Sequence, residues 1–285
     1  MKLLLTGANG QLGRCIQDRL PAGWSIWATD SNELDITNQD AVLSAVKEFQ
    51  PDAIINAAAY TAVDKAEGEP DLARLVNEVG PENLAIASKI NGSLLIHVST
   101  DYVFDGTSST PYCENDKTGP LGIYGITKLA GEKAVIRENP KSIIIRTAWV
   151  FSEYGNNFVK TMLRVGKDRS NLNIVDDQVG CPTYAGDIAN TIINLLKIDA
   201  PVGIYNYCGD SFISWCGFSK VIFDIAKELN IVDTTPIVNA ITSDQYPTPV
   251  KRPNFSVLNT SKIEQLGMVP SNWKNALYIV LPKIS

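Results

Sequence analysis

Tyr124 and Lys128 stand four residues apart in a segment whose pattern predicts a helix. At this spacing two side chains share one face of a helix. Thr100 comes shortly after a mainly apolar run, residues 94–98, that is typical of a buried parallel strand. An ammonium group lowers the pKa of a neighbouring phenol, and a phenol with a lowered pKa can donate a proton at neutral pH. A Tyr–Lys pair on a helix, with Thr100 nearby, can therefore deliver a proton to a carbonyl oxygen, although a solvated amphipathic helix can carry the same pattern.

A second group of residues lies near the N-terminus, where three glycines follow the spacing Gly7-x-x-Gly10-x-x-Gly13. The motif stands between a predicted strand and a predicted helix. In this setting glycines allow a tight turn and a close approach of the backbone to phosphate, and the helix N-terminus faces a pyrophosphate. We expect a dinucleotide to be bound by the loop residues Gly7, Asn9, Gly10, Gln11, Leu12 and Gly13.

Asp30 ends the second predicted strand, about 20 residues beyond the glycines, where a carboxylate binds the 2′-hydroxyl of an adenine ribose. This favours NADH. No lysine or arginine follows Asp30, although Ser31, Asn32 or the nearby Arg14 could bind a 2′-phosphate, so NADPH stays open. We also expect the cofactor to contact the residues that follow the second and third strands: Asp35, Ile36, Ala57, Ala58, Ala59 and Tyr60.

Strands and helices alternate over the first half of the chain. Strands are predicted at residues 2–5, 24–29, 52–56, 93–98 and 142–146, with helices after the glycines and at 38–49, within 70–91 and at 124–138. This alternation predicts an α/β fold with a doubly wound parallel sheet. Beyond residue 146 prolines become frequent, and helices are predicted only at 157–166, 184–197, 215–229 and 261–266. We therefore expect a dinucleotide-binding domain at 1–150 and a smaller, irregular α/β lobe for the substrate at 151–285, with some chain crossing between them.

The composition excludes several classes of function. The chain has 285 residues, 45% hydrophobic and 20% charged, and a net charge of −6 without a run of like charges. This balance argues against nucleic-acid binding, and no apolar stretch is long enough for a membrane span. Five scattered cysteines are typical of a cytoplasmic protein with reduced thiols. His97 is the only histidine, so sites with several histidines are excluded, and we expect it to be packed and hydrogen-bonded.

Several stretches, in order along nearly the whole chain, together resemble the extended short-chain dehydrogenases and reductases. Within that superfamily the resemblance is to enzymes that reduce dTDP-linked 4-keto-6-deoxy sugars. It rests on the glycine motif and on residues 56–67 (beginning Asn56-Ala57-Ala58-Ala59-Tyr60), 99–106 (beginning Ser99-Thr100-Asp101-Tyr102), 124–132, 146–151, 155–158, 177–183 and 246–253.

The resemblance implies a Rossmann-type fold, NADPH or NADH as cofactor, and reduction of the 4-keto group of a dTDP-linked 4-keto-6-deoxyhexose. It assigns the catalytic roles to the same Thr100, Tyr124 and Lys128. Arg252 stands in a proline-rich loop near where related enzymes bind a diphosphate, and its planar fork suits phosphate oxygens. We expect the substrate to be bound by Thr100, Asp101, Tyr102, Tyr124, Arg252 and Trp149, the last as a wall of the sugar pocket.

The sequence departs from the family at one position. Some members dimerise through a magnesium ion held by carboxylates, one of them just after the glycine loop. This chain has Cys15 there, and Mg²⁺ prefers oxygen ligands. We therefore expect no bound metal, and a monomer or a homodimer without a metal bridge.

Other functions on the same fold stay open. The chain could be another sugar-nucleotide 4-ketoreductase, an epimerase, or a non-catalytic subunit that binds cofactor and a partner protein. A dehydratase is disfavoured, because Asp101 is followed by Tyr102 rather than by a glutamate. Intact Thr100, Tyr124 and Lys128 favour catalysis.

Overall fold

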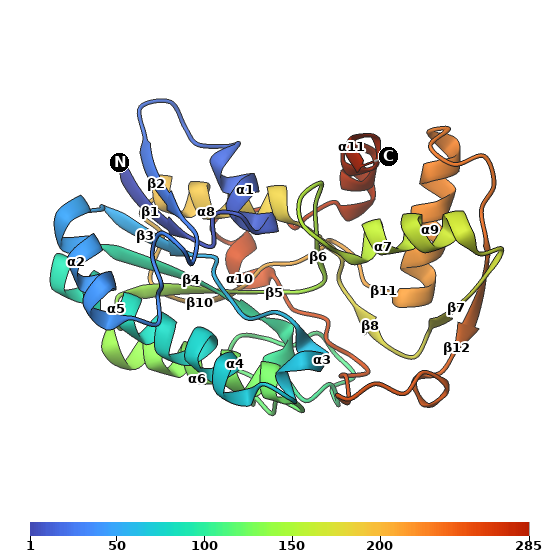
Figure 1. Ribbon diagram of the computed structural model, residues 1–285, viewed down its shortest axis with the longest axis horizontal. Helices are drawn as coiled ribbons and strands as arrows, with labels where there is room; N and C mark the ends of the chain where they lie inside the picture. Colours follow the sequence, from blue (N-terminus) through green and yellow to red (C-terminus); the bar gives the residue numbers. More distant parts are fainter. Residues whose placement is uncertain (285) are drawn as a thin grey trace.

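The computed structural model describes residues 1–284, and its largest element is a six-stranded parallel sheet in the order β10-β5-β4-β3-β1-β2 (Figure 1). The α/β fold with a Rossmann-like parallel sheet is thereby confirmed. The strands are β1 (Lys2–Thr6), β2 (Ser25–Thr29), β3 (Ala53–Asn56), β4 (Leu94–Thr100), β5 (Ser142–Thr147) and β10 (Gly203–Asn206).

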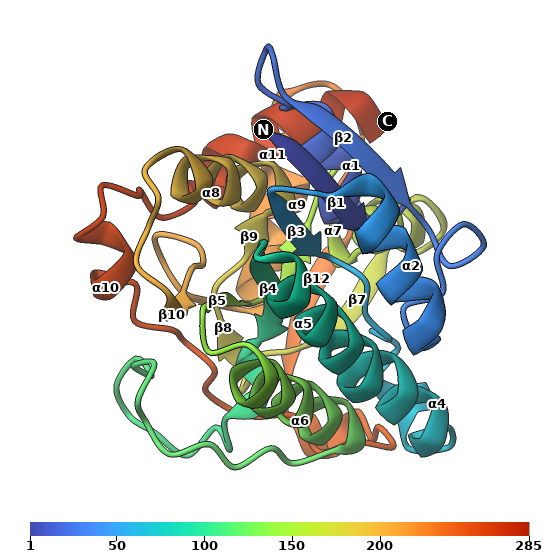
Figure 2. The same ribbon diagram turned by 90° about the vertical axis from the view of Figure 1, so that its left-hand side faces the viewer.

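Helices cover both faces of the sheet because successive strand residues point to opposite sides. Leu3 and Leu5 pack with α1 (Gln11–Gln17) and α8 (Ala185–Lys197). Leu4 points the other way and packs with α2 (Gln39–Phe49), α5 (Gly80–Asn91) and α6 (Ile123–Glu138). Figure 2 shows α8 on one side of the sheet and α5 and α6 on the other.

The order of the strands changes at β1, which pairs with β2 on one side and with β3 on the other. After β2, the chain continues on the opposite side of β1. Thr6 and Asn56, the last residues of β1 and β3, lie side by side in this register. In open α/β sheets the crevice at such a switch point is where ligands bind. The glycine loop after β1 and the alanine loop after β3 therefore open into the same crevice.

A second apolar core lies beside the sheet and holds the second lobe together. It is formed mainly by α7 (Phe158–Asp168), α9 (Trp215–Glu228) and α11 (Trp273–Ile284). Three short strand pairs complete the lobe: β7 (Asn171–Val175) with β12 (Ile237–Ile241), β6 (Val150–Phe151) with β9 (Thr183–Tyr184), and β8 (Val179–Gly180) with β11 (Ile213–Ser214). The remaining elements are α3 (Val63–Ala66), α4 (Pro70–Arg74), η1 (Leu75–Val79), η2 (Asp101–Val103), η3 (Ser243–Gln245) and α10 (Ser261–Glu264).

The five predicted strands of the first half are all present, with ends within two residues of those expected. The helix expected within residues 70–91 is instead three segments, α4, the π-helical η1 and α5. Pro81 explains this break, because it has no N–H to donate to the carbonyl of Asn77. The sequence did not predict β10, α11 or the short strands of the second lobe.

The boundary between the lobes does not follow a single point in the chain. Residue 150 lies in β6, whereas α8 and β10 return from the later half to complete the sheet layer. The division into 1–150 and 151–285 therefore stays a proposal, in which α8 and β10 of the second part pack with the first part. Among residues 1–284, no helix combines the length and the apolar character needed to cross a membrane.

Candidate active site

The helix α6 carries Tyr124 in its first turn and Lys128 one turn later. Gly122 precedes the helix and has no side chain to cap it, but the Glu67 carboxylate accepts a hydrogen bond of 2.7 Å from the N–H of Ile123. A Cβ at Gly125 would lie 2.3 Å from the carbonyl oxygen of Tyr102, so only glycine lets α6 lie directly on η2. These contacts bring Tyr124 to the C-terminal end of β4.

Polar groups around Tyr124 form a short network at that end of β4. Thr100 lies close enough to the Tyr124 hydroxyl to affect its pKa, and Thr100 Oγ1 donates to Asp101 Oδ1 at 3.0 Å. The Tyr102 ring meets the Tyr124 ring edge-on, with 5.5 Å between centroids. The structure thus brings together four of the predicted site residues, Thr100, Asp101, Tyr102 and Tyr124.

Burial decides the protonation of the Tyr–Lys pair. It raises the pKa of Tyr124 to about 12, although the nearby Thr100 hydroxyl acts in the opposite direction. It also lowers the pKa of Lys128 to about 8, and Lys128 Nζ donates to the carbonyl oxygen of Val98 at 2.7 Å. The expectation that Lys128 lowers the pKa of Tyr124 is therefore wrong for this structure. The phenol stays protonated through the neutral range, which suits a proton donor.

Two further titratable groups lie on β4 and directly after it. Burial raises the pKa of Asp101 to about 6, against the effect of hydrogen bonds from Ser256 and Thr100. Burial also holds the pKa of His97 well below its usual value, and the Nδ1 atom of His97 lies 3.0 Å from the side-chain nitrogen of Asn56. The expectation of a packed, hydrogen-bonded His97 is confirmed.

The glycine loop and the alanine loop touch at the switch point. Gly7 has a φ of +74°, and a Cβ there would lie 2.6 Å from the carbonyl carbon of Ala57 and the nitrogen of Ala58. A Cβ at Gly13 would lie 2.2 Å from the carbonyl oxygen of Gly7. The glycines therefore permit the tight turn and close helix packing of a dinucleotide-binding loop.

Asp30 is tied to this loop by its side chain. Asn9 Nδ2 donates to Asp30 Oδ2 at 2.6 Å, and Arg14 Nη2 donates to Asn9 Oδ1 at 3.1 Å. A carboxylate and a guanidinium thus lie at the two ends of a hydrogen-bonded chain that runs through Asn9. The carboxylate suits a ribose hydroxyl and the guanidinium suits a 2′-phosphate, so the donor set fits both NADH and NADPH.

Three other predicted cofactor residues have structural partners of their own. Asp35 Oδ1 accepts hydrogen bonds from the nitrogen and hydroxyl of Thr37, while the Ile36 side chain is buried in the core. The Tyr60 hydroxyl donates to Glu69 at 2.6 Å. Cofactor contacts by Asp35, Ile36 and Tyr60 stay predictions.

Gln11 joins the glycine loop to the second lobe. Its Oε1 accepts hydrogen bonds from Ser152 Oγ at 3.0 Å and from Asn157 Nδ2 at 2.9 Å. Its neighbour Leu12 packs against the core of the sheet. A side chain predicted to bind cofactor is therefore also a link between the lobes, which spacing along the chain could not reveal.

Trp149 follows β5 in an unusual backbone conformation, with a φ of +46°. Its ring stacks on Trp215, with 3.4 Å between centroids and an angle of 5° between planes. On Gly180 a Cβ would lie 2.5 Å from the Trp149 ring. A left-handed conformation is unfavourable for a bulky residue and persists only where the surroundings fix it. The stack and the glycine together hold the Trp149 ring in place.

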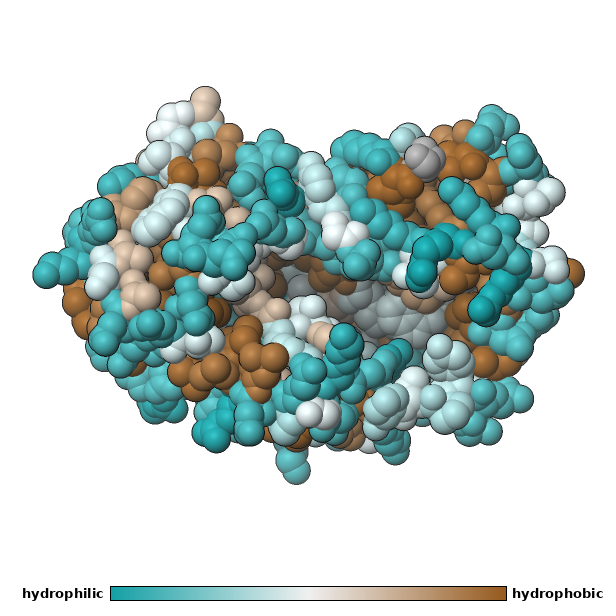
Figure 3. All heavy atoms as spheres, viewed as in Figure 1, coloured by the Kyte–Doolittle hydropathy of each residue, from teal (hydrophilic) through white to brown (hydrophobic). Residues whose placement is uncertain are grey.

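Arg252 lines a cavity of about 700 Å³ in the second lobe, together with Phe158, Trp215, Tyr246 and other residues of α7, β7 and the 241–252 segment. Figure 3 shows a hollow between the two lobes on this face. Arg252 Nη2 donates to Asp64 Oδ2 at 2.8 Å. The cavity joins Arg252 to aromatic side chains and thus offers both charge and stacking surface to a ligand.

Sequence reasoning did not single out Asp64, Glu67 or Trp215. The first two lie in the stretch 56–67 that carried the family resemblance, and their spacing of three residues would place both on one helical face. Trp215 has no comparable signal, because its partner Trp149 is distant in the chain.

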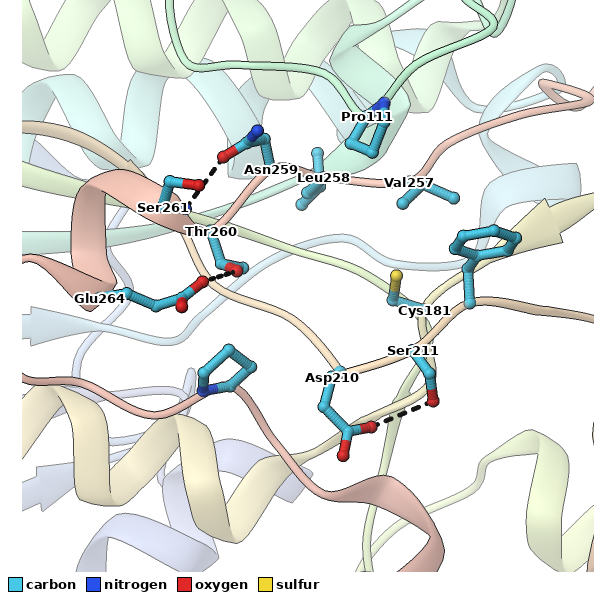
Figure 4. Close-up of a pocket in the computed structure, with 13 residues that line it drawn as sticks. Pro111, Cys181, Asp210, Ser211, Val257, Leu258, Asn259, Thr260, Ser261 and Glu264 are labelled. Carbon is cyan, nitrogen blue, oxygen red and sulfur yellow. Dashed lines mark hydrogen bonds between the residues drawn. The ribbon is translucent and has the colours of Figure 1, made fainter.

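A second cavity, of about 330 Å³, is lined by residues including Cys181, Asp210, Asn259 and Glu264 (Figure 4). None of the site residues predicted from the sequence lines it. Two of its polar side chains are engaged with neighbours, since Asp210 accepts from Ser211 and Glu264 from Thr260.

Residues 1–284 contain no cluster of three or more histidine, cysteine, aspartate or glutamate side chains placed to hold a metal ion. Cys15 is fully buried, and burial raises the pKa of its thiol to about 12. A buried, protonated thiol is a poor partner for Mg²⁺, and the absence of a metal bridge stays a prediction.

Comparison with known proteins gives consistent results. The family model described as the RmlD substrate binding domain matches residues 1–285. The chain is 49% identical over 284 residues to a dTDP-4-dehydrorhamnose reductase from Aggregatibacter actinomycetemcomitans, with 97% of each chain covered. A dTDP-4-dehydrorhamnose reductase structure from Clostridium acetobutylicum superposes with a TM-score of 0.93, at 42% identity and 99% coverage of both chains. The enzyme from Bacillus anthracis in complex with NADP gives a TM-score of 0.92, at 38% identity and the same coverage.

Proposed function

Because this chain belongs to the RmlD substrate binding domain family, we propose that it reduces the 4-keto group of dTDP-4-dehydro-L-rhamnose with NADPH or NADH and gives dTDP-L-rhamnose. It is accordingly an NAD(P)H-dependent oxidoreductase. The observation that carries the proposal is the position of Tyr124 beside Thr100 at the end of β4, with Lys128 on the same helix.

Tyr124 is the proton donor. Its phenol donates a proton to the keto oxygen as negative charge develops there, and Thr100 supplies a second hydroxyl beside that oxygen. Lys128 Nζ donates to the carbonyl oxygen of Val98, and when the cofactor is bound Lys128 would hold the nicotinamide ribose. The raised pKa of Tyr124 keeps the donor protonated before the reaction.

The glycine loop, Asp30 and the alanine loop would hold the cofactor. The support is the contact between Gly7 and Ala57 at the switch point and the chain of bonds from Arg14 through Asn9 to Asp30. When bound, the reduced nicotinamide supplies the hydride for the keto carbon. Gly10 would let the backbone approach the pyrophosphate, while Gly7 and Gly13 permit the turn and the helix packing.

The remaining predicted residues bind the sugar nucleotide. Asp101 and Tyr102 contact the sugar beside Tyr124, and Trp149 forms a wall of its pocket. Arg252 binds the diphosphate, and the cavity of about 700 Å³ next to it takes the nucleoside. Remote contacts of this kind orient the keto group for reaction.

For the setting of this reaction we propose the cytoplasm and a monomer or a homodimer. Sugar-nucleotide substrates and reduced cofactors are cytoplasmic metabolites, and five cysteines stay free thiols in the structure. The buried thiol at Cys15 supports a protein that needs no metal bridge.

Purified protein mixed with NADPH and dTDP-4-dehydro-L-rhamnose tests the function. We expect loss of the reduced-nicotinamide absorbance and an equal amount of dTDP-L-rhamnose, identified by chromatography. Cofactor binding without any oxidation of NADPH would favour the non-catalytic subunit instead.

A further inference from the structure

An ion pair ties the substrate side of the cleft to the cofactor side. Asp64 lies in the first turn of α3, just after the alanine loop, whereas Arg252 lies in the segment that lines the large cavity. Arg252 Nη2 donates to Asp64 Oδ2 at 2.8 Å across 188 residues of sequence. Arg252 is 27% exposed and Asp64 41% exposed. At such exposure an ion pair contributes little stability, about 0–1 kcal/mol, so its main effect is on geometry.

The pair occupies only part of the guanidinium. Arg252 Nε is buried and has no hydrogen-bond partner within residues 1–284, and Asp64 Oδ1 is in the same situation. A buried donor without a partner is costly in free energy. A guanidinium has five N–H donors in a rigid fork, so one edge can hold Asp64 while another stays free for an anion. Nε is one buried donor without a partner, and the exposed part of the guanidinium remains open to a ligand oxygen.

The surroundings place this donor close to the reacting centre. Burial raises the pKa of Tyr102, the positive charge of Arg252 acts against this rise, and the negative charge of Asp64 adds to it. Both charges therefore lie near Tyr102, whose ring contacts Tyr124. Glu67, three residues after Asp64, accepts the hydrogen bond from the first turn of α6. The α3 segment thus contacts both the catalytic helix and the guanidinium.

We propose that Asp64 is a positioning residue for Arg252: it fixes the guanidinium so that its free N–H groups meet the diphosphate of the sugar nucleotide. The inference rests on the proposed function of Arg252. A long arginine side chain loses rotamer entropy when a ligand fixes it, and a side chain that is already fixed loses less. Asp64 therefore strengthens substrate binding without touching the substrate.

Steady-state kinetics of Asp64→Ala, Arg252→Ala and the double variant test this proposal. We expect Asp64→Ala to raise the KM for the sugar nucleotide about tenfold, which corresponds to about 1.4 kcal/mol, with a smaller fall in kcat and an unchanged KM for NADPH. Arg252→Ala should raise the same KM further. The double variant should match Arg252→Ala alone, because a positioning residue has no effect once its partner is gone.

Two further variants complete the test. Asp64→Asn keeps the shape of the side chain and one acceptor oxygen, so its KM should lie between those of the natural protein and Asp64→Ala. Asp71→Ala removes an exposed carboxylate from the first turn of the neighbouring α4 and should leave every constant unchanged. Thermal midpoints of all variants should agree closely, as expected for a partly exposed ion pair.

The outcomes separate this inference from the function on which it rests. An unchanged sugar-nucleotide KM in Arg252→Ala would overturn the diphosphate role of Arg252 and the inference together. A raised KM in Arg252→Ala, with no effect of Asp64→Ala or with additive effects in the double variant, would overturn only the positioning role. A lower KM in Asp64→Ala would mean that Asp64 competes with the diphosphate, which also contradicts the proposal.

Discussion

Burial moves the titratable groups around Tyr124 toward their neutral forms. It raises the pKa values of Tyr124 and Asp101 and lowers that of Lys128. The sequence shows the spacing of Tyr124 and Lys128. It does not show whether burial or a neighbouring charge has the larger effect on the pKa of Tyr124. That balance depends on how closely α6 lies on η2, which the small size of Gly125 permits.

Asp101 gives this effect a measurable consequence for stability. Its pKa is raised from 3.8 to about 6, so the protonated form is favoured by folding. The stabilisation is complete below about pH 4 and is lost as the pH rises through about 6, with a slope of up to about 1.4 kcal/mol per pH unit. The asparagine of the Asp101→Asn variant cannot ionise, so this variant should not lose stability in this way as the pH rises.

Urea unfolding of the natural protein and Asp101→Asn from pH 4 to pH 8 tests this prediction. The free energy of unfolding of the natural protein should fall relative to that of the variant between about pH 4 and pH 6 and stay level above. All other groups are common to both proteins and cancel in the difference. A difference that does not change with pH would contradict the shifted pKa.

At the scale of elements, short-range patterns predicted those parts of the site that are local in sequence. The glycine loop, the end of β2 at Asp30 and the helix with Tyr124 and Lys128 lie where spacing and periodicity indicated. The contacts of Glu67 with α6 and of Asp64 with Arg252 join distant segments, and no periodicity encodes them. β10 was missed because its residues Gly203–Asn206 form no apolar run comparable to that of β3, which is equally short.

The start of α6 should depend on Glu67. Glu67→Ala removes the acceptor for the N–H of Ile123, and loss of a helix cap typically costs about 1 kcal/mol. Because Tyr124 lies in the same turn, kcat should fall as well, while Glu67→Gln, which keeps an acceptor oxygen, should recover part of both losses.

Urea unfolding and steady-state kinetics would measure these two effects. Glu138→Ala is the matched control, since this glutamate ends α6 and makes only an exposed ion pair with Arg137. It should change the free energy of unfolding by less than about 0.5 kcal/mol. Equal effects of the Glu67 and Glu138 substitutions would rule out a specific cap.

At the scale of the whole molecule, the chain crosses between the lobes. The sequence suggested a division at residue 150, but the sheet needs β10 at one edge and α8 over one face. The sequence indicated some chain crossing between the lobes but not which elements cross, because strand order in a sheet depends on long-range pairing. Gln11 adds hydrogen bonds between the lobes beside the glycine loop.

A fragment of residues 1–150 should therefore not fold as an independent unit. Without α8 it would expose the apolar face formed by residues such as Leu3, Leu5 and Ile55, and large exposed apolar patches lead to aggregation. Circular dichroism and binding of a hydrophobic dye would show this, with a fragment of residues 1–210 as a comparison that retains both elements. Cooperative unfolding of the 1–150 fragment would contradict the expectation.

The most direct test of the proposed reaction is the turnover of Tyr124→Phe with NADPH and dTDP-4-dehydro-L-rhamnose. Phenylalanine keeps the ring against Tyr102 but has no proton to donate. We predict a kcat lower by a factor of about 100 to 10,000, the usual contribution of a positioned proton donor, with unchanged affinity for NADPH. A kcat close to that of the natural protein, at equal substrate saturation, would contradict the role of Tyr124 and the mechanism built on it.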